Sequence, residues 1–301
     1  MLCMILVSCT GQKTGKENDN NDKIAIEVGE IKFPPQDVLQ LKSYYLSSSV
    51  HVDSIDYLIG YNYRLHSLDC MNLKSKSVTQ IVLPGDGPDA IVRLSGIYAQ
   101  SLDSVWISDE SERAFLIDSV GTIKRMIDLK KYLEDQEQLL INTNYAMFTS
   151  HLFYNASRHS LMFLVKHTPS NTFIVKEVFI DEVGKMATYQ LSSSKVVPDM
   201  SKGYAYINFP NVNFVGENIV YNYPVESSIY MLDIRTNERK YILADSHYTS
   251  NIIEKCTTSG DYATLEKHWL ENSHFYDITY LPKYKIYARL HADKVDFDEK
   301  K

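Results

Sequence analysis

The chain of 301 residues has few of the features that identify an enzyme or a metal-binding protein from sequence alone. It contains only four cysteines, and none of them stands near another cysteine or a histidine at the spacing of a zinc site. The metalloprotease motif H-E-x-x-H and the hydrolase motif G-x-S-x-G are both missing. We therefore assign no catalytic residue, no metal site and no cofactor from the sequence.

A surplus of positive charge is also missing. Lys and Arg number 31 against 38 Asp and Glu, which gives a net charge of −7. Proteins that bind nucleic acid need clustered basic residues to displace counterions from the phosphates, so nucleic acid is not an expected partner. No apolar run reaches the roughly eighteen residues of a membrane-spanning helix.

The first residues carry the clearest motif, a short apolar run that ends in Leu6-Val7-Ser8-Cys9. This run matches a bacterial lipobox, whose cysteine receives a diacylglyceryl group while the segment before it is removed. Residues 1–8 hold no Lys or Arg, unlike the usual start of a secretory signal, which favours a start codon upstream of Met1. The alternative is an ordinary apolar N-terminus with a buried cysteine. The motif predicts lipid attachment at Cys9.

The residues after Cys9 favour the lipoprotein interpretation. Residues 11–22 include no apolar side chain, so they cannot bury enough surface to offset the entropy of ordering. We expect a signal segment at 1–8, a lipidated cysteine and disordered tether at 9–23, and a folded domain at 24–301. The protein is then expected in the cell envelope, anchored by its lipid to a membrane, with the outer membrane favoured.

Two cysteines remain in the folded domain, Cys70 and Cys256. A disulfide between them is possible in an oxidising compartment. Two isolated thiols are more often buried separately.

One pattern recurs four times in the domain: an apolar run ends in Asp, a short turn follows, and a second strand begins. The four aspartates lie 49, 63 and 52 residues apart and are Asp69, Asp118, Asp181 and Asp233. An Asp carboxylate can accept a hydrogen bond from the backbone two residues on, so we interpret these residues as turn formers rather than as a carboxylate site.

A further apolar strand precedes each of these aspartates. The four segments are 56–63, 104–108, 160–165 and 218–223. Repeats of about 40–55 residues with several short strands are typical of β-propeller blades. A β-sandwich is the alternative, but it does not account for a period near fifty. The sequence therefore predicts an all-β fold, a β-propeller.

Segments outside the repeats complete this prediction. Asp261–Asn272 has helical spacing and an N-terminal Asp cap, which predicts one short helix, and a second helix is considered at Leu129–Ile141. Ile24–Val28 is the candidate closing strand. Tyr284–Leu290 resembles the inner strand of a further blade, and because the chain stops soon after it, we expect the C-terminal blade or blades to be missing or truncated.

Several segments together resemble a known family: Y-L-I-G-Y-N at 57–62, L-P-G-D-G-P-D at 83–89, D-S-V-W-I at 103–107 and the aromatic-rich stretch 275–290. They are similar to an uncharacterised family of lipoproteins from gut anaerobes, a domain of unknown function with a six-bladed, TolB-like propeller. The resemblance covers most of residues 40–290 and implies six blades. It brings no activity and no catalytic residue.

A ligand site is suggested by the repeated fragment Tyr-Asn-Tyr, at Tyr61-Asn62-Tyr63 and at Tyr221-Asn222-Tyr223. Tyrosines at strand ends can stack on a sugar or clamp a peptide, and Asn supplies both a donor and an acceptor. The site requires one exposed tyrosine in each fragment, whereas packing between blades would bury the rings. The function expected is a binding or assembly module for a glycan, peptide or protein. The alternative is an extracytoplasmic hydrolase or lyase acting on glycans, with carboxylates at the mouth of the propeller.

Overall fold

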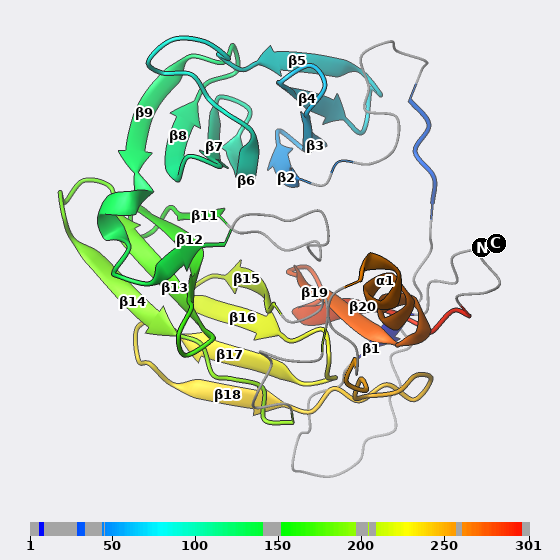
Figure 1. Cartoon of the computed structure of the whole chain (residues 1–301). Helices are drawn as coiled ribbons and strands as arrows, with labels where there is room; N and C mark the ends of the chain where they lie inside the picture. Colours follow the sequence, from blue (N-terminus) through cyan, green and yellow to red (C-terminus); the bar gives the residue numbers. More distant parts are fainter. Residues whose placement is uncertain are drawn as a thin grey trace. The chain divides into compact units, whose positions relative to one another are not determined.

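The computed structural model describes residues 6–8, 29–33, 44, 46–140, 152–196, 204, 209–256 and 261–296. The chain divides into two compact units: Ile31–Ser192, and Met1–Glu30 together with Ser193–Lys301. The fold is all-β, a β-propeller whose blades are antiparallel four-stranded meanders. Figure 1 shows each meander as a sheet of successive strands.

The unit Ile31–Ser192 contains three blades. The first has strands β2 (Ser47–Val52), β3 (Ile55–Asn62), β4 (Ser67–Asn72) and β5 (Val78–Val82). The second has β6 (Leu94–Ser101), β7 (Ser104–Asp109), β8 (Arg113–Ile117) and β9 (Ile123–Asp128). The third has β11 (Leu152–Asn155), β12 (Ser160–His167), β13 (Thr172–Phe179) and β14 (Met186–Gln190), and β10 (Glu137–Leu139) pairs with β12 on the same edge as β11.

The second unit contains a fourth blade and a smaller sheet. The blade has β15 (Asn211–Val215), β16 (Asn218–Asn222), β17 (Ile229–Asp233) and β18 (Arg239–Ile242). The smaller sheet has the order β1 (Leu6–Ser8), β20 (Ile286–Ala292), β19 (His274–Leu281). The described residues thus supply four blades and a three-stranded sheet, and the count of six stays a prediction.

The core of each unit lies between neighbouring sheets. Ile59 and Leu68 of the first blade cluster with Ile107 and Phe115 of the second. Trp106 of the second blade packs in another cluster with residues of the third blade. In the second unit, Ile229 of β17 packs with Ile278 of β19. The middle strands are covered on both faces, whereas the outer strands, such as β14, alternate between more and less exposed residues. This explains why the middle strands have nearly continuous apolar runs.

The four segments predicted as strands before the aspartates, 56–63, 104–108, 160–165 and 218–223, are confirmed as β3, β7, β12 and β16. The helix at Asp261–Asn272 is also confirmed: α1 spans Tyr262–Glu271, and the Asp261 carboxylate caps it by accepting a hydrogen bond from the Thr264 amide at 3.1 Å.

The prediction of a second helix at Leu129–Ile141 is wrong. Only Leu129–Tyr132 forms a 3-10 helix, and Glu137–Leu139 is strand β10. The apolar residues of this segment serve two different elements, so their spacing imitates a helix. The strand expected at Tyr284–Leu290 is present as β20. The candidate closing strand Ile24–Val28 and the tether 9–23 lie outside the described residues, whereas Leu6–Ser8 pairs with β20.

The turn after the third strand of a blade is closed by a side-chain oxygen in three of the four blades. Oδ1 of Asp118 accepts hydrogen bonds from the amides of Val120 (3.1 Å) and Thr122 (2.8 Å). Oδ1 of Asp233 accepts them from Arg235 (2.8 Å) and Thr236 (3.0 Å). These two aspartates are turn formers, as the repeat predicts.

In the first copy of the repeat, the predicted turn residue lies three residues too early. Asn72, not Asp69, closes the turn after β4, where its Oδ1 accepts from the amides of Lys74 (2.9 Å) and Ser75 (2.8 Å). Asp69 lies inside β4, fully buried, and its carboxylate accepts hydrogen bonds from Asn62 Nδ2 at 3.0 Å and Gln80 Nε2 at 2.5 Å. Asp69 therefore ties neighbouring strands together within its blade.

Candidate ligand pocket

The first Tyr-Asn-Tyr fragment ends β3 and serves mainly to hold the following turn. Tyr61 and Asn62 are buried, and Oδ1 of Asn62 accepts hydrogen bonds from the amides of Arg64 (3.2 Å) and Leu65 (3.3 Å). Only Tyr63, with 52% of its surface exposed, presents a ring to solvent.

The second fragment does not meet the condition of one exposed tyrosine. Tyr221 and Tyr223 are 1% and 2% exposed. Tyr221 stacks on Tyr230 with ring centroids 5.1 Å apart, and burial raises the pKa of Tyr223 well above its usual value. These rings pack inside the second unit, so they offer no surface to a sugar or a peptide. The paired-tyrosine surface is therefore not formed.

Asn222 of this fragment is fully buried, and neither its Oδ1 nor its Nδ2 has a hydrogen-bond partner in the part of the chain that the structure describes. Its cross-strand neighbour is Asn211 of β15, whose Nδ2 donates to the carbonyl of Phe275 at 3.2 Å. The amide of Phe275 in turn donates to the carbonyl of Pro224. This region links β15 and β16 to β19, next to a pocket.

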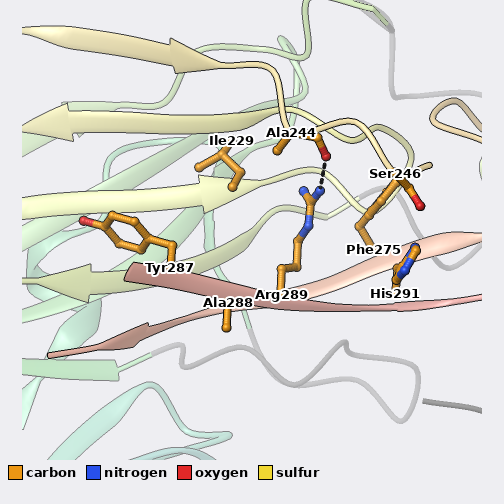
Figure 2. Close-up of a pocket in the computed structure, with 8 residues that line it drawn as sticks. All are labelled: Ile229, Ala244, Ser246, Phe275, Tyr287, Ala288, Arg289 and His291. Atoms are coloured by element: carbon orange, nitrogen blue, oxygen red, sulfur yellow. Dashed lines mark hydrogen bonds between the residues drawn. The ribbon is translucent and has the colours of Figure 1, made fainter. Parts of the chain in front are cut away.

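The pocket is a small hollow, partly open to solvent, within the second unit. Its eight lining residues come from β17, from the segment after β18, from β19 and from β20 (Figure 2): Ile229, Ala244, Ser246, Phe275, Tyr287, Ala288, Arg289 and His291. Tyr287, Arg289 and His291 alternate along β20. Because side chains two apart on a strand project to the same face, this alternation brings all three to the pocket.

Arg289 is the one charged residue among the eight. Its side chain rises from β20 toward the segment after β18, where Nη2 donates a hydrogen bond to the carbonyl oxygen of Ala244 at 3.2 Å (Figure 2). The guanidinium carbon lies 4.2 Å from the centre of the Phe275 ring. A guanidinium on an aromatic face is held by a cation–π interaction, so the cation has a fixed place in the pocket.

His291 stands beside it on β20. Its ring stacks on Phe275 with centroids 5.7 Å apart, and Nδ1 lies 2.9 Å from Oγ1 of Thr249. The residue is 8% exposed, and Nε2 is buried without a hydrogen-bond partner in the described part of the chain. Burial and the nearby Arg289 lower the pKa of His291, an effect that Asp293 partly opposes, so the ring is neutral near pH 7.

Sequence reasoning did not identify this pocket. It recognised 284–290 as a strand, and the alternation of Tyr287, Arg289 and His291 was the available signal. Which sheet this face would meet depends on contacts with β17 and β19, which no local pattern contains. The eight lining residues include one cation, one histidine ring and apolar side chains, and none of them is Asp or Glu.

Elsewhere, the described residues contain no group of three or more His, Cys, Asp or Glu arranged to hold a metal ion. None of the described helices is both long and apolar enough to cross a membrane. Cys70 is a free, buried thiol whose pKa burial raises to about 11, which agrees with the packing role considered for it.

No family model and no curated protein matches the chain. Among solved structures, a member of the DUF4221 family from Bacteroides vulgatus matches with a TM-score of 0.64 and 14% identity, over 88% of this chain and 75% of that one. Raptor from Chaetomium thermophilum matches with a TM-score of 0.42 and 7% identity, over 83% of this chain and 20% of that one. Hydrazine synthase from Kuenenia stuttgartiensis gives 0.39 and 12%, over 70% and 56%.

The first of these likenesses supports the propeller fold. It is also consistent with the resemblance to an uncharacterised family of gut anaerobes, while the low identity transfers no function. The likenesses to Raptor and to hydrazine synthase are too weak to support an argument.

Proposed function

We propose that the protein is a membrane-anchored, extracytoplasmic β-propeller that binds a glycan, peptide or protein through the pocket at Arg289, without chemical conversion of the partner. The single observation that carries the proposal is the composition of this pocket, which is lined by an oriented guanidinium, a histidine ring and apolar side chains. Pockets with apolar walls and a few convergent polar groups are typical of ligand sites.

The pocket does not favour the alternative of a glycan hydrolase. Glycoside hydrolysis generally uses two carboxyl groups that flank the scissile bond, and the eight lining residues include neither Asp nor Glu. Nothing at this pocket supplies a general acid paired with a base or nucleophile. Binding is therefore the better-supported role.

The anchoring part of the proposal rests on the lipobox. Cleavage before Cys9 removes Leu6–Ser8, which here pairs with β20 through Leu6↔Leu290, Val7↔Arg289 and Ser8↔Ala288. The mature lipoprotein therefore lacks β1, and the backbone of β20 has an open edge at these positions. Mass spectrometry of the N-terminus of protein purified from membranes distinguishes the two forms.

The binding role is tested with the full chain on arrays of glycans and peptides, using wild type, Arg289→Leu and the control Arg235→Ala. Arg235 lies in the same unit but away from the pocket, with its guanidinium paired to Glu217 at the surface. We expect a ligand that binds wild type and Arg235→Ala and loses affinity for Arg289→Leu. Turnover of any bound glycan, or no binding by wild type, contradicts the proposal.

A further inference from the structure

We propose that residues 246–251 form a lid that closes the His291 end of the pocket and opens when a ligand enters. This inference rests on the proposed binding function, because it concerns access to the same pocket. The lid has the sequence Ser-His-Tyr-Thr-Ser-Asn and lies between β18 and α1. Its first residue, Ser246, lines the pocket together with Phe275 and His291 (Figure 2).

The lid is held in shape by its own side chains. The side-chain amide of Asn251 bonds both main-chain groups of Ser246: Oδ1 accepts from the Ser246 amide at 2.7 Å, and Nδ2 donates to the Ser246 carbonyl at 3.1 Å. Oγ of Ser246 accepts hydrogen bonds from the amides of Tyr248 (3.1 Å) and Thr249 (3.2 Å). None of these four bonds leaves the segment, so the lid keeps them when it moves as a unit.

The chain at both ends of the lid is attached to the rest of the second unit. Before the lid, the carbonyl of Ala244 accepts a hydrogen bond from Nη2 of Arg289 at 3.2 Å. At its last residue, the carbonyl of Asn251 accepts one from the amide of Ser227 at 3.1 Å. Movement is therefore confined to the short segment between these two attachments.

In the part of the chain that the structure describes, one hydrogen bond joins the lid to β20: Oγ1 of Thr249 lies 2.9 Å from Nδ1 of His291. We call this bond the latch. The other side chains at the tip add little to it, because Tyr248 is 67% exposed and His247 and Ser250 are exposed as well. Segments with few buried apolar contacts open at a low cost in free energy, so the latch is the main contact that opposes opening.

With the lid closed, neither ring nitrogen of His291 is accessible. Nδ1 is covered by the Thr249 hydroxyl, and Nε2 is buried. Opening breaks the latch, uncovers Nδ1 and withdraws Ser246 from the wall, which widens the pocket at this end. Access to the histidine ring therefore depends on the lid.

The test measures how fast diethyl pyrocarbonate modifies each histidine of the full chain at pH 7, followed by mass spectrometry of its peptides. The reagent attacks a neutral, accessible ring nitrogen. Because burial and Arg289 lower the pKa of His291, its accessibility decides its rate. His51, with a side chain 65% exposed, is the exposed reference, and His274, 3% exposed and not bonded to the lid, is the buried one. We expect wild-type His291 to react much more slowly than His51.

Thr249→Val removes the latch and keeps the shape of the side chain. We expect it to raise the rate at His291 about three- to tenfold, which is the change in the opening equilibrium that one ordinary hydrogen bond accounts for. The rates at His51 and His274 should stay unchanged. Two matched controls should react as wild type does: Thr249→Ser, which keeps the hydroxyl, and Ser250→Ala, which removes a lid hydroxyl that does not reach β20.

The inference is overturned if wild-type His291 reacts as fast as His51, or if Thr249→Val changes the rate at His291 no more than Thr249→Ser does. It is also overturned if His274 is accelerated together with His291, because the substitution then loosens the unit and not the lid. The labelling needs no ligand, so its failure leaves the binding function standing. Absence of every ligand on the arrays overturns the binding function and leaves the labelling result as it is.

Discussion

Side-chain oxygens at strand ends stabilise turns in this chain by accepting hydrogen bonds from backbone amides. Asn72, Asp118 and Asp233 occupy the same turn in three blades, and each accepts two backbone hydrogen bonds. Asp181, at the corresponding turn of the third blade, is exposed instead and lies 3.4 Å from the guanidinium of Arg125. One residue type at one place in the repeat thus has two different roles.

Replacing Asp118 tests the turn role. Lys124 and the amides of Thr122 and Val120 hold the pKa of Asp118 at about 2, below its value in an unfolded chain of about 3.9. We expect Asp118→Ala to lower the melting temperature at pH 7 by about 2–4 °C, measured by circular dichroism. Asp181→Ala is the matched control and should change it little.

The sign of the pH dependence follows from the lowered pKa of Asp118. Its stabilisation is present above pH 4 and is lost as the pH falls from about 4 toward 2. Wild type and Asp118→Ala should therefore converge in melting temperature in this range. A constant difference down to pH 2 would show that the ionised carboxylate is not what stabilises the turn.

Asp277 behaves in the opposite way. It lies at an irregularity in the pairing of β19 with β20, between Phe275 and Ile278, and its carboxylate accepts a hydrogen bond from the Ile278 amide at 2.7 Å. No cation of the described residues forms an ion pair with it, and burial raises its pKa to about 8. The folded state therefore holds a proton that the unfolded chain releases near pH 4.

Folding stability should fall between about pH 4 and pH 8 because of this difference. We expect Asp277→Asn to raise the melting temperature at pH 8 and to leave it nearly unchanged at pH 4, since the amide resembles the protonated carboxyl. Thermal unfolding at both pH values checks this. A decrease at pH 8 would mean that the ionised carboxylate is needed in the fold.

At the scale of single elements, β13 is unusual because it buries two charged residues side by side, Lys176 and Glu177. Lys176 Nζ lies 2.6 Å from a carboxylate oxygen of Glu137 and donates to the carbonyl of Tyr132 at 2.9 Å. This contact ties β10 and the 3-10 helix to the middle of the blade. Buried charges of this kind are tolerated only when paired.

Glu177, on the other face of β13, is enclosed by donors. Arg158 binds it with two hydrogen bonds of 2.8 and 3.0 Å, Ser160 Oγ donates at 2.5 Å, and the Tyr189 hydroxyl donates at 2.7 Å. Burial raises the pKa of Tyr189, and the hydrogen bond to Glu177 and the negative charge of Glu177 raise it further. The network joins the turn before β12 to β13 and β14.

We expect Arg158→Ala to lower the free energy of unfolding by about 2–4 kcal/mol, because it leaves the Glu177 carboxylate buried without a cation. Urea denaturation measures the change. Arg125→Ala is the control: Arg125 pairs with Asp181 at the surface, and such pairs contribute about 0–1 kcal/mol. Equal effects of the two substitutions would contradict the assigned role of the buried network.

At the scale of the whole molecule, the question is where the protein is held. A lipid on Cys9 followed by the polar segment 11–22 would connect the propeller to a membrane surface. Acylation of the protein and its retention in the membrane fraction can be measured together in the native host.

Cys9→Ala should abolish the incorporation of labelled fatty acid and release the protein from the membrane fraction, because the thiol is the attachment site. A Cys3→Ala variant is the matched control and should still be acylated, since Cys3 precedes the lipobox. Acylation that persists in Cys9→Ala would refute the assignment.

How much could be predicted depended on how local the cause of each feature is. The middle strands β3, β7, β12 and β16 were predictable because blades cover both of their faces, which leaves continuous apolar runs. The cap of α1 at Asp261 was predictable for a local reason, because the Thr264 amide that it accepts from is only three residues away. The spacing of the turns at Asp118 and Asp233 indicated the blades.

The sequence by itself therefore determined the all-β class, the blade repeat, helix α1 and the lipobox motif, because each of them leaves a pattern within a short stretch of residues. Only the tertiary structure decided that Tyr221 and Tyr223 are buried, that Asp69 lies inside a strand, and that Tyr287, Arg289 and His291 line a pocket. The physical reason is that burial and pocket formation depend on which face of one sheet meets its neighbour, and the residues on the two sides of that contact are far apart in the chain.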